Sequence, residues 1–296
     1  MINGKQVSFV LVNYKNFKVT IDCVNSLLKN EPNSSIVVVE NFSQNNSFEM
    51  LKKEFDSFNQ VNVINTKKNV GYANALNIGI HFSRTVLKSD FVVISNSDIL
   101  YQDYLGVEKT IETGYKNGVG VISMSMLNDD LSFQNPYGCY NHSPLLTFMR
   151  TLLFVTRESF RTLRKKGGQS TVISGSFSDY FNRFRYIVNT ASGVLTPDFF
   201  KHYSFLHPKT FIYLEEACLY FYLRKAKLKA SFTNCCQVIH LEKQSTDNPD
   251  YYRKKIKRLR KAMWVLFPLL FKNEKRISKS NLKEVNRKIL PNADYL

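Results

Sequence analysis

Asp98 is well placed in this sequence to hold a metal ion, because it closes a short polar segment directly after an apolar run. The run 91–95 ends in Asn96-Ser97-Asp98. In open α/β sheets, ligands bind just beyond the carboxyl ends of the strands. A carboxylate there can hold Mg²⁺ or Mn²⁺, which take oxygen ligands and often bridge to phosphates. Polar turns also follow strands without any ligand, so this segment needs support from the rest of the chain.

Two more candidate side chains lie late in the sequence. The apolar lead-in 211–214 delivers Glu215-Glu216 to the start of a predicted helix, where one carboxylate could act as a general base. Acids in a first helical turn are also favoured by the helix dipole alone. His240 closes the short apolar run 238–240 and is either a buried core histidine or a further metal ligand.

A small-residue segment at 68–80 could approach a ligand closely. Asn69 and Gly71 predict a turn before a helix that carries Asn77. Small residues at a helix N-terminus let a ligand reach the backbone amides, although an ordinary helix cap has the same pattern. The segment is neither a GxGxxG fingerprint nor a Walker loop, which weakens the dinucleotide-binding and P-loop readings.

The elements that must position these residues alternate along the first hundred residues. Continuous apolar runs at 7–12, 35–40, 61–65 and 91–95 predict buried strands, and the segments between them have helical spacing. Such alternation predicts an α/β fold with a parallel sheet. Polar residues after the strands, including Asn13 and Glu40, would then meet at one edge of the sheet.

Taken in order, these segments resemble the family 2 glycosyltransferases, in particular bacterial rhamnosyltransferase-like members that build surface polysaccharides. The resemblance covers roughly residues 5 to 245, and its strength lies in the order of its motifs. The matching segments are VSFVLVNYKN, VVVENFSQNNS, NVGYANALNIGI, NSD, ASGVLTPDFF, FIYLEEACL and HLEKQS.

The resemblance implies a GT-A type fold, a Rossmann-like and mostly parallel sheet flanked by helices, with a basic helical C-terminal extension. Residues 1–249 would form the glycosyltransferase domain, with a nucleotide-binding half (1–100) and an acceptor half (101–249). Residues 250–296 would form a basic amphipathic tail.

The resemblance also assigns roles to the candidate residues. Glu216 stands at the position of the catalytic base, and Asp98 at that of the metal ligand, assisted by His240. Two positions depart from the family pattern: Cys218 replaces an acid and Tyr222 an arginine. The implied nucleotide-sugar contacts are Asn13, Glu40, Asn69, Gly71, Asn77 and Asn96.

The implied activity is inverting transfer of a sugar from a pyrimidine nucleotide donor, a UDP-sugar or dTDP-rhamnose, with Mg²⁺ or Mn²⁺ as cofactor. The implied acceptor is a polyprenyl-linked glycan of bacterial surface polysaccharide synthesis, capsule or exopolysaccharide. No covalent intermediate is needed, because a base can activate the acceptor hydroxyl for direct attack.

Composition limits the setting of this activity. A chain of 296 residues accommodates one large α/β domain. Its five cysteines lack C-x-x-C spacing and predict reduced thiols in a cytoplasmic protein. We find no signal peptide and no apolar segment of the roughly 18 residues that a membrane span requires.

The net charge of +17 is concentrated in residues 142–186 and 250–296. Both stretches also carry apolar clusters, at 145–155 and 263–271. Basic residues beside apolar ones predict peripheral attachment to anionic lipids at the inner face of the cell membrane. The alternative is that the apolar parts pack on the body of the protein and the basic faces are only solvated.

Other classes of protein remain as alternatives. We expect no nucleic-acid partner, because the charges lie beside apolar runs and no nucleic-acid module is recognisable. A nucleotidyltransferase would need a glycine-rich loop after the first strand, which 13–18 lacks. A non-catalytic nucleotide-sugar-binding relative fits Asn96 and Cys218. The sugar, the oligomeric state and the role of 142–186, whose Gly/Ser stretch 167–178 could form a lid, stay open.

Overall fold

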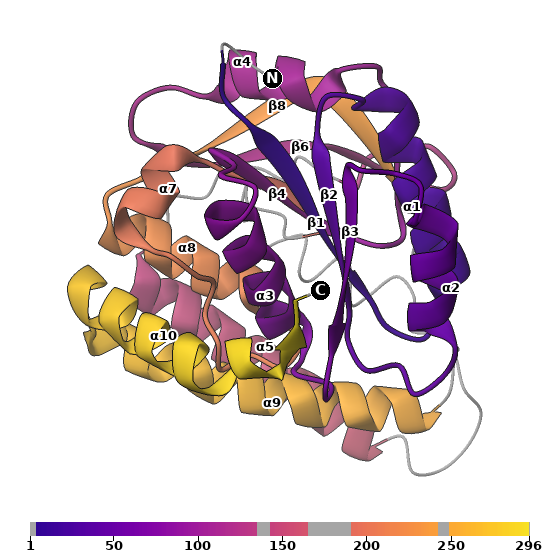
Figure 1. The fold of residues 1–296 in the computed structure, drawn as a ribbon. Coiled ribbons are helices and arrows are strands. Elements are labelled where there is room, and N and C mark those ends of the chain that lie inside the picture. The colour runs from indigo at the N-terminus through magenta and orange to yellow at the C-terminus, as the bar shows by residue number, and fades with distance from the viewer. Residues whose placement is uncertain (1–3, 135–142, 165–190, 242–248, 296) are drawn as a thin grey trace.

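A nine-stranded sheet forms the centre of the computed structural model (Figure 1). The structure describes residues 4–134, 143–164, 191–241 and 249–295. The stretch 167–178 and Cys139 lie outside these residues. The order of strands across the sheet is β5-β8-β6-β7-β4-β1-β2-β3-β9.

The N-terminal half confirms the predicted alternation of strands and helices. Its four strands pair in parallel, because each of the first three is followed by a helix that returns the chain to the same end of the sheet. These strands are β1 (Val7–Asn13), β2 (Ser35–Glu40), β3 (Val61–Thr66) and β4 (Phe91–Asn96). The helices are α1 (Phe17–Asn30), α2 (Ser47–Phe55) and α3 (Tyr72–Thr85).

The helices divide between the two faces of the sheet and so create two apolar cores. Residues of α1 and α2 share one core with one side of the strands, and residues of α3 share the other. Gly79 allows α3 to lie close to β1, since a Cβ there would be 2.2 Å from Val10 Cγ1. Burial on both faces explains why the strands are continuously apolar.

The second half of the chain changes the sheet from parallel to mixed. β7 (Ser192–Leu195) lies between β4 and β6 and runs antiparallel to both. β6 (Val119–Asn128) pairs in parallel with β8 (Lys229–His240), and β5 (Ile99–Tyr101) closes the edge antiparallel to β8. The helices are α4 (Gly106–Gly114), α5 (Pro144–Arg164), α7 (Pro197–His202) and α8 (Glu215–Lys225).

The C-terminal basic segment packs on this body. It forms α9 (Pro249–Phe271), α10 (Glu274–Lys288) and a 3-10 turn (Leu290–Asn292), and ends in β9 (Ala293–Asp294), which pairs antiparallel with β3. Leu259 and Leu266 of α9 are buried in the core. The inner side of α9 therefore fits the alternative in which the apolar residues of the C-terminal segment pack on the body of the protein. Removal of residues 250–296 would expose the core residues that α9 covers.

Tyr222 ties this segment to α8. Its hydroxyl accepts a hydrogen bond from Asn281 Nδ2 of α10 and lies 2.8 Å from His207 Nδ1. Its ring stacks on Tyr203, with centroids 4.4 Å apart. A buried tyrosine with satisfied polar partners thus stands where the family commonly has arginine, and it serves packing.

Two further predictions can be compared with the described residues. Within them, no helix combines the length and apolar character needed to cross a membrane. Of the five cysteines, the structure describes Cys23, Cys218, Cys235 and Cys236, each as a free thiol, and their redox state in the cell stays a prediction.

Candidate active site

The ends of β1, β2 and β4 meet at one edge of the sheet, as the sequence predicted. Asn13 lies opposite Glu40 across the β1–β2 pair, and Val12 lies opposite Asn96 across the β1–β4 pair. Parallel strands in register must end together, so their polar residues are brought side by side. The candidate residues fall into two groups at this edge.

The first group is organised by Glu40, whose side chain is buried. Its carboxylate accepts hydrogen bonds from the backbone amides of Phe42 and Ser43, each at 3.0 Å, and from the Ser43 hydroxyl. Asn13 Nδ2 donates to the same carboxylate at 3.4 Å. These four donors show that Glu40 holds the loop after β2 in place, and its direct contact with a nucleotide base stays a prediction.

The loop after β2 is joined to the turn before α3. Asn41 Nδ2 donates to Asn69 Oδ1 at 3.3 Å, and Asn69 Oδ1 also accepts from the Gly71 amide at 3.0 Å. Gly71 has φ +86°, and a Cβ there would lie 2.7 Å from the Phe211 carbonyl oxygen. Only glycine fits this contact, which brings the start of α3 against the segment that leads to Glu215 and Glu216.

Asn77 lies away from this open edge. It is fully buried, its Nδ2 donates to the Leu206 carbonyl at 3.2 Å, and its Oδ1 accepts from the Leu206 amide at 2.8 Å. Both ends of the amide are therefore used to hold one loop on α3. The structure gives Asn77 a supporting position, and its contact with a nucleotide sugar stays a prediction.

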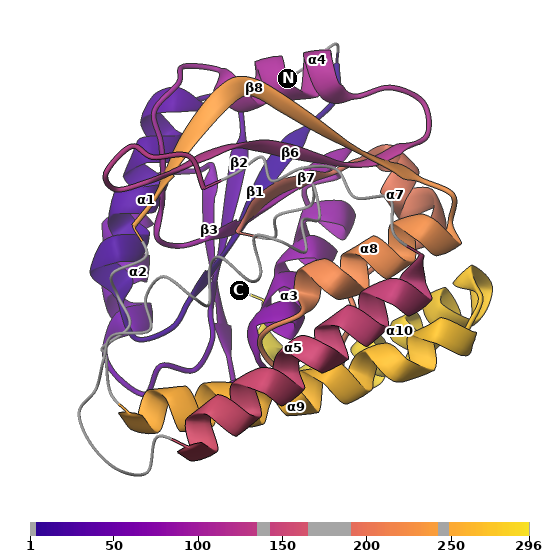
Figure 2. The same cartoon turned by 180° about the vertical axis from the view of Figure 1, so that it is seen from behind.

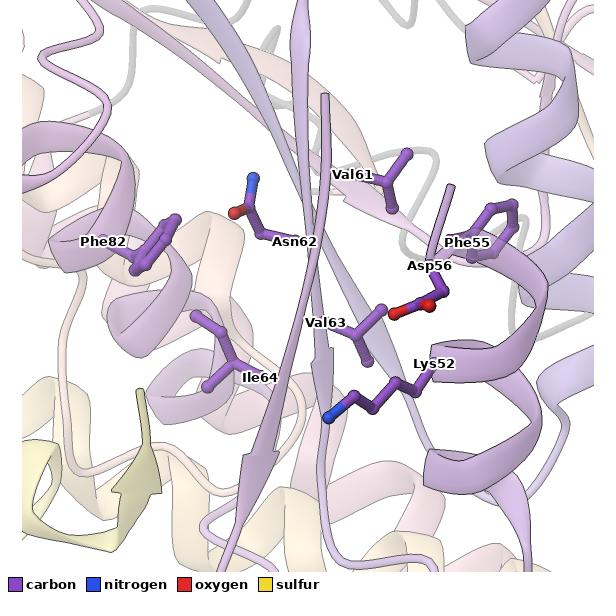
Figure 3. Close-up of a pocket in the computed structure, with 8 residues that line it drawn as sticks. All are labelled: Lys52, Phe55, Asp56, Val61, Asn62, Val63, Ile64 and Phe82. Atoms are coloured by element: carbon purple, nitrogen blue, oxygen red, sulfur yellow. The ribbon is translucent and has the colours of Figure 1, made fainter. Parts of the chain in front are cut away.

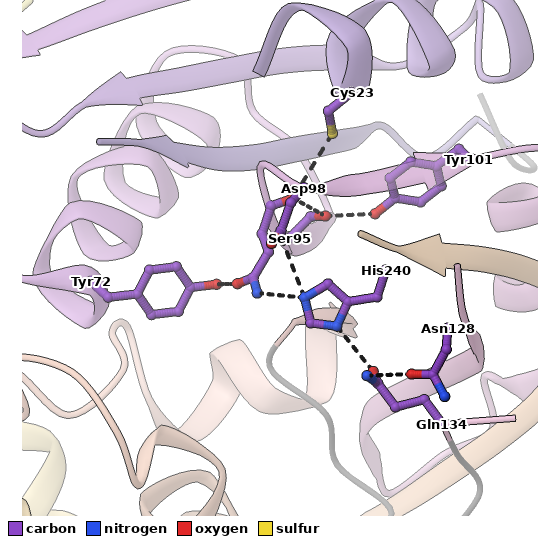
Figure 4. A network of polar contacts seen from close by, with 9 residues as sticks. Cys23, Tyr72, Ser95, Asp98, Tyr101, Asn128, Gln134 and His240 are labelled. Carbon is purple, nitrogen blue, oxygen red and sulfur yellow. Dashed lines mark hydrogen bonds and ion pairs between the residues drawn. The ribbon is translucent and has the colours of Figure 1, made fainter. Parts of the chain in front are cut away.

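The second group is built on Asp98 and His240. β5 begins at Ile99, which lies opposite His240 in the pairing with β8, and the Leu241 amide donates to the Asp98 carbonyl at 2.9 Å. This pairing places Asp98 Oδ1 3.3 Å from His240 Nε2 (Figure 4). Two predicted metal ligands from distant parts of the sequence are thus brought together.

Asn96 connects this pair to α3. Its Oδ1 accepts a 2.6 Å hydrogen bond from the Tyr72 hydroxyl, and its Nδ2 lies 3.4 Å from His240 Nε2 (Figure 4). Burial raises the pKa of Tyr72 well above its usual value, and the negative charges of Glu215, Glu216 and Asp98 raise it further. All three carboxylates therefore lie within electrostatic reach of one hydroxyl group.

Glu215 and Glu216 differ sharply in their surroundings. Glu215 is buried, and its Oε1 has no hydrogen-bond partner among the described residues. Burial, and then the charge of Glu216, raise the pKa of Glu215 to about 8. Glu216 is half-buried. Both follow two residues in the left-handed region, Tyr213 (φ 78°) and Leu214 (φ 67°), a strained turn of the kind that gathers at functional sites.

Gln134 is a site residue that the sequence analysis missed. Its Oε1 accepts a hydrogen bond from His240 Nδ1 at 3.0 Å, and its Nε2 donates to Asn128 Oδ1 at 3.1 Å (Figure 4). Asn128 thus fixes the amide orientation, and Gln134 holds the proton of His240 on Nδ1. Gln134 lies in an irregular segment after β6, where the sequence has no periodic signal, so spacing could not have found it. Tyr72 was also missed, because it reads as an ordinary first helical residue.

The resulting arrangement suits a cation. Asp98 Oδ1 and His240 Nε2, 3.3 Å apart, form an ion pair when the imidazole is protonated. A neutral imidazole with its proton on Nδ1 would instead offer the Nε2 lone pair to a cation beside the carboxylate. No group of three or more His, Cys, Asp or Glu suited to a metal occurs in the described part of the chain. Two protein ligands leave positions for phosphate oxygens and water, as is common for Mg²⁺ and Mn²⁺ beside nucleotides.

A separate pocket of about 190 Å³ lies along the first residues of β3, with α2 on one side of the strand and Phe82 of α3 on the other (Figure 3). It contains none of the predicted site residues. Its lining residues are Lys52, Phe55, Asp56, Val61, Asn62, Val63, Ile64 and Phe82.

Solved glycosyltransferase structures share this fold at low sequence identity. GalNAc-T7 with UDP, GalNAc and Mn²⁺ is 15% identical with a TM-score of 0.55, over 86% of this chain and 48% of that one. The mannosyltransferase PcManGT from Pyrobaculum calidifontis with GDP-Man and Mn²⁺ is 10% identical with a TM-score of 0.53, over 97% of this chain and 76% of that one. The chain thus spans about half the length of GalNAc-T7. No curated relative matches the sequence.

The family model of glycosyl transferase family 2 matches residues 8–185. The matched region begins in β1 and includes Asn13, Glu40, Asn69, Asn96 and Asp98, which the structure gathers at one edge of the sheet. The architecture around these residues, a mostly parallel sheet flanked by helices, is the GT-A type that the resemblance implied. The chain belongs to glycosyl transferase family 2.

Proposed function

We propose that the protein is an inverting glycosyltransferase that moves a sugar from a pyrimidine nucleotide donor, a UDP-sugar or dTDP-rhamnose, to a glycan acceptor. The observation that carries this proposal is the Asp98–His240 pair, 3.3 Å apart at the sheet edge. Glu215 and Glu216 lie near this pair, because their charges and that of Asp98 all raise the pKa of the Tyr72 hydroxyl. Such a transfer needs a cation to neutralise the leaving diphosphate and a nearby carboxylate to accept the proton of the acceptor hydroxyl.

Asp98 Oδ1 and His240 Nε2 would hold the divalent cation. When bound, the ion neutralises the charge that develops on the leaving nucleoside diphosphate. A nitrogen ligand suits a transition metal better than Mg²⁺, which favours Mn²⁺ of the two candidates. Gln134 supports the pair by keeping the proton of His240 on Nδ1. The Mn²⁺ bound by GalNAc-T7 and PcManGT supports a divalent cation as cofactor, and the ligands Asp98 and His240 are part of the proposal.

Glu216 would act as the general base. Burial, and then the charge of Glu216, raise the pKa of Glu215 to about 8, which favours its protonated form at neutral pH and leaves Glu216 as the better proton acceptor. Glu216 takes the proton of the acceptor hydroxyl while that oxygen attacks the anomeric carbon. The bond from this carbon to the phosphate oxygen breaks on the opposite face, and the electron pair leaves with the diphosphate. The configuration is inverted, and a neutral Glu215 spares Glu216 a second adjacent charge.

The nucleotide would lie against the joined loops at the ends of β1 and β2 and the start of α3. Asn13, Asn69, Gly71 and Asn96 lie in or beside this region, and Glu40 acts by fixing its backbone. We assign residues 1–100 to the nucleotide-binding half, residues 101–249 to the acceptor half and residues 250–296 to the C-terminal extension.

The proposed acceptor is a polyprenyl-linked glycan in bacterial surface polysaccharide synthesis, used at the inner face of the cell membrane. What supports this setting is the large positive charge of the chain and its concentration near apolar residues.

A thermal-shift screen of nucleotide sugars with Mn²⁺ tests the proposal, because a ligand stabilises the folded state by RT ln(1 + [L]/Kd). We expect one UDP- or dTDP-sugar to raise the Tm with Mn²⁺ and not with EDTA, and the same donor to be consumed with release of its nucleoside diphosphate. Asp98→Ala should lose this shift, whereas the exposed control Asp22→Ala should keep it. Equal shifts with and without metal, or no shift with any nucleotide sugar, would contradict the proposal.

A further inference from the structure

Helices α5 and α9 lie side by side on the outside of the molecule (Figures 1 and 2). Phe148, near the start of α5, and Phe267, near the end of α9, have ring centroids 5.6 Å apart. The start of one helix therefore meets the end of the other, and the two run antiparallel. Both turn an apolar side toward the core, with Phe148 and Val155 of α5 and Leu259 and Leu266 of α9 buried.

The outer sides of the same helices are also apolar. On α5 the exposed residues recur with helical spacing, and on α9 Trp264 and Phe271 are 68% and 72% exposed. Phe267 lies between these two rings, with centroids at 6.3 and 5.3 Å. The α5–α9 face, as we define it, comprises Leu145, Leu146, Met149, Leu153, Trp264, Phe267 and Phe271.

The exposed basic residues that the structure describes on α5 and α9 lie toward one end of this face. Along α5 the apolar residues come first and the exposed Arg157 follows, whereas along α9 the exposed Lys257, Arg260 and Lys261 come first and the aromatic residues follow. Because the helices are antiparallel, the opposite sequence orders give the same order in space along the pair. The apolar ends of the two helices lie together, and so do their basic ends.

We propose that the α5–α9 face docks on an anionic phospholipid surface, with the apolar end in the interface and Arg157, Lys257, Arg260 and Lys261 on the lipid phosphates. Patches of exposed large apolar residues on soluble proteins mark interaction sites. Aromatic and leucine residues beside lysine and arginine form the pattern of helices that lie in the plane of a membrane interface. This inference goes beyond sugar transfer, and it identifies α5 as half of a surface that the C-terminal segment alone does not provide.

A second copy of the chain fits this face less well. A two-fold interface places the same patch of both copies together, and the described residues of this patch offer basic side chains and no acidic ones to its own copy, in a chain of net charge +17. An anionic surface has the complementary charge. It also takes up the apolar end, which a nucleic acid would leave exposed.

Trp264 provides a direct readout, because it is the only tryptophan of the chain and lies in the proposed contact. The full-length protein is mixed with vesicles of phosphatidylcholine alone or with phosphatidylglycerol added, without nucleotide or sugar. We expect a blue shift of the tryptophan emission and co-sedimentation with the anionic vesicles only, both weakened by high salt. An unchanged emission with anionic vesicles would overturn the proposal.

Double variants distinguish binding through the α5–α9 face from a general attraction of the basic protein to anionic vesicles. Leu153→Ser with Phe271→Ser, and Lys257→Glu with Arg260→Glu, should each reduce vesicle binding by at least about tenfold, since both parts of the face contribute. Val86→Ser is the matched control, because Val86 is 59% exposed at the end of α3, against 62% for Leu153. Equal binding by control and variants would contradict the proposal, as would light scattering that shows a dimer broken by the same variants.

This experiment is independent of the proposed function. Vesicle binding is measured without donor or acceptor, so a failed glycosyltransferase assignment leaves it unaffected. Near-ultraviolet circular dichroism and the Tm without ligand confirm that each variant is folded. All four substituted positions are exposed, so we expect their Tm values to match that of the wild type.

Discussion

Two carboxylate sites lie at the same edge of the sheet, and their hydrogen bonding separates them. Glu40 accepts hydrogen bonds from two backbone amides, a hydroxyl and an amide side chain, so its charge is already compensated. Asp98 lies 3.3 Å from His240 Nε2, a contact that compensates its charge only when the imidazole is protonated, and Glu215 has a buried oxygen without a partner among the described residues. A compensated carboxylate holds structure, whereas an uncompensated one is available to a ligand or a proton.

The largest effect on turnover should come from Glu216. Glu216→Gln removes the proton acceptor but keeps the shape, so we expect normal donor binding and a loss of turnover of ~10²–10⁴-fold. Glu215→Gln replaces a group that is already neutral, and should cost much less. Steady-state kinetics on both variants measures this contrast, and a larger loss for Glu215→Gln would move the base to that residue.

Gln134 should affect the metal more than the fold. Gln134→Leu removes the acceptor for His240 Nδ1–H, so we expect Mn²⁺ affinity, measured by electron paramagnetic resonance with UDP present, to fall by about 10–100-fold. Gln134→Glu keeps an acceptor at this position and should restore most of the affinity. If both variants bind Mn²⁺ as the wild type does, the hydrogen bond has no role in the site.

Glu40 should behave in the opposite way. Glu40→Gln places an amide group against backbone N–H donors, so we expect a loss of about 1–3 kcal/mol in the free energy of unfolding. The affinity for Mn²⁺ should stay unchanged. Urea unfolding and the Mn²⁺ titration together check this, and a stable Glu40→Gln protein with weakened metal binding would erase the distinction between the two sites.

The pH dependence of stability should reveal Glu215 with a smaller effect. Its pKa is raised from 4.5 to about 8 in the folded state, so the folded protein binds the proton more tightly than the unfolded chain. The contribution of Glu215 to the free energy of unfolding is therefore fully present below the pKa of the unfolded chain and is lost as pH rises to about 8. The free energy of unfolding should fall over this range by at most about 1.4 kcal/mol per pH unit. Glu215→Gln should flatten this part of the unfolding profile, and an identical slope in the variant would contradict the assignment.

Local sequence patterns were enough to predict the alternating strands and helices of the N-terminal half of the fold. The runs at β1, β2 and β4 are buried on both faces, so their composition is dictated by the core and shows directly in the sequence. The meeting of Asp98 and His240 was predicted only through resemblance to a family, because the β5–β8 pairing joins residues far apart in the chain.

The hydrogen-bond partners of the site residues and the packing of α5 on α9 could not be predicted from local sequence patterns. Glu40 and Asp98 both follow apolar strands, and the donors that compensate only Glu40 depend on the loop that folds over it. Gln134 acts through an irregular segment. The apolar and basic stretches of α5 and α9 have opposite orders in the sequence, and only their antiparallel packing brings like ends together.

The central claim is that Asp98 and His240 form the cation site of a glycosyltransferase. The most direct test is a Mn²⁺ titration by electron paramagnetic resonance with UDP present, comparing wild type, Asp98→Ala and Asp22→Ala. We predict saturable binding for wild type and Asp22→Ala, and a loss of binding for Asp98→Ala with an unchanged Tm in the absence of metal. Equal Mn²⁺ affinity for Asp98→Ala and wild type would contradict the account.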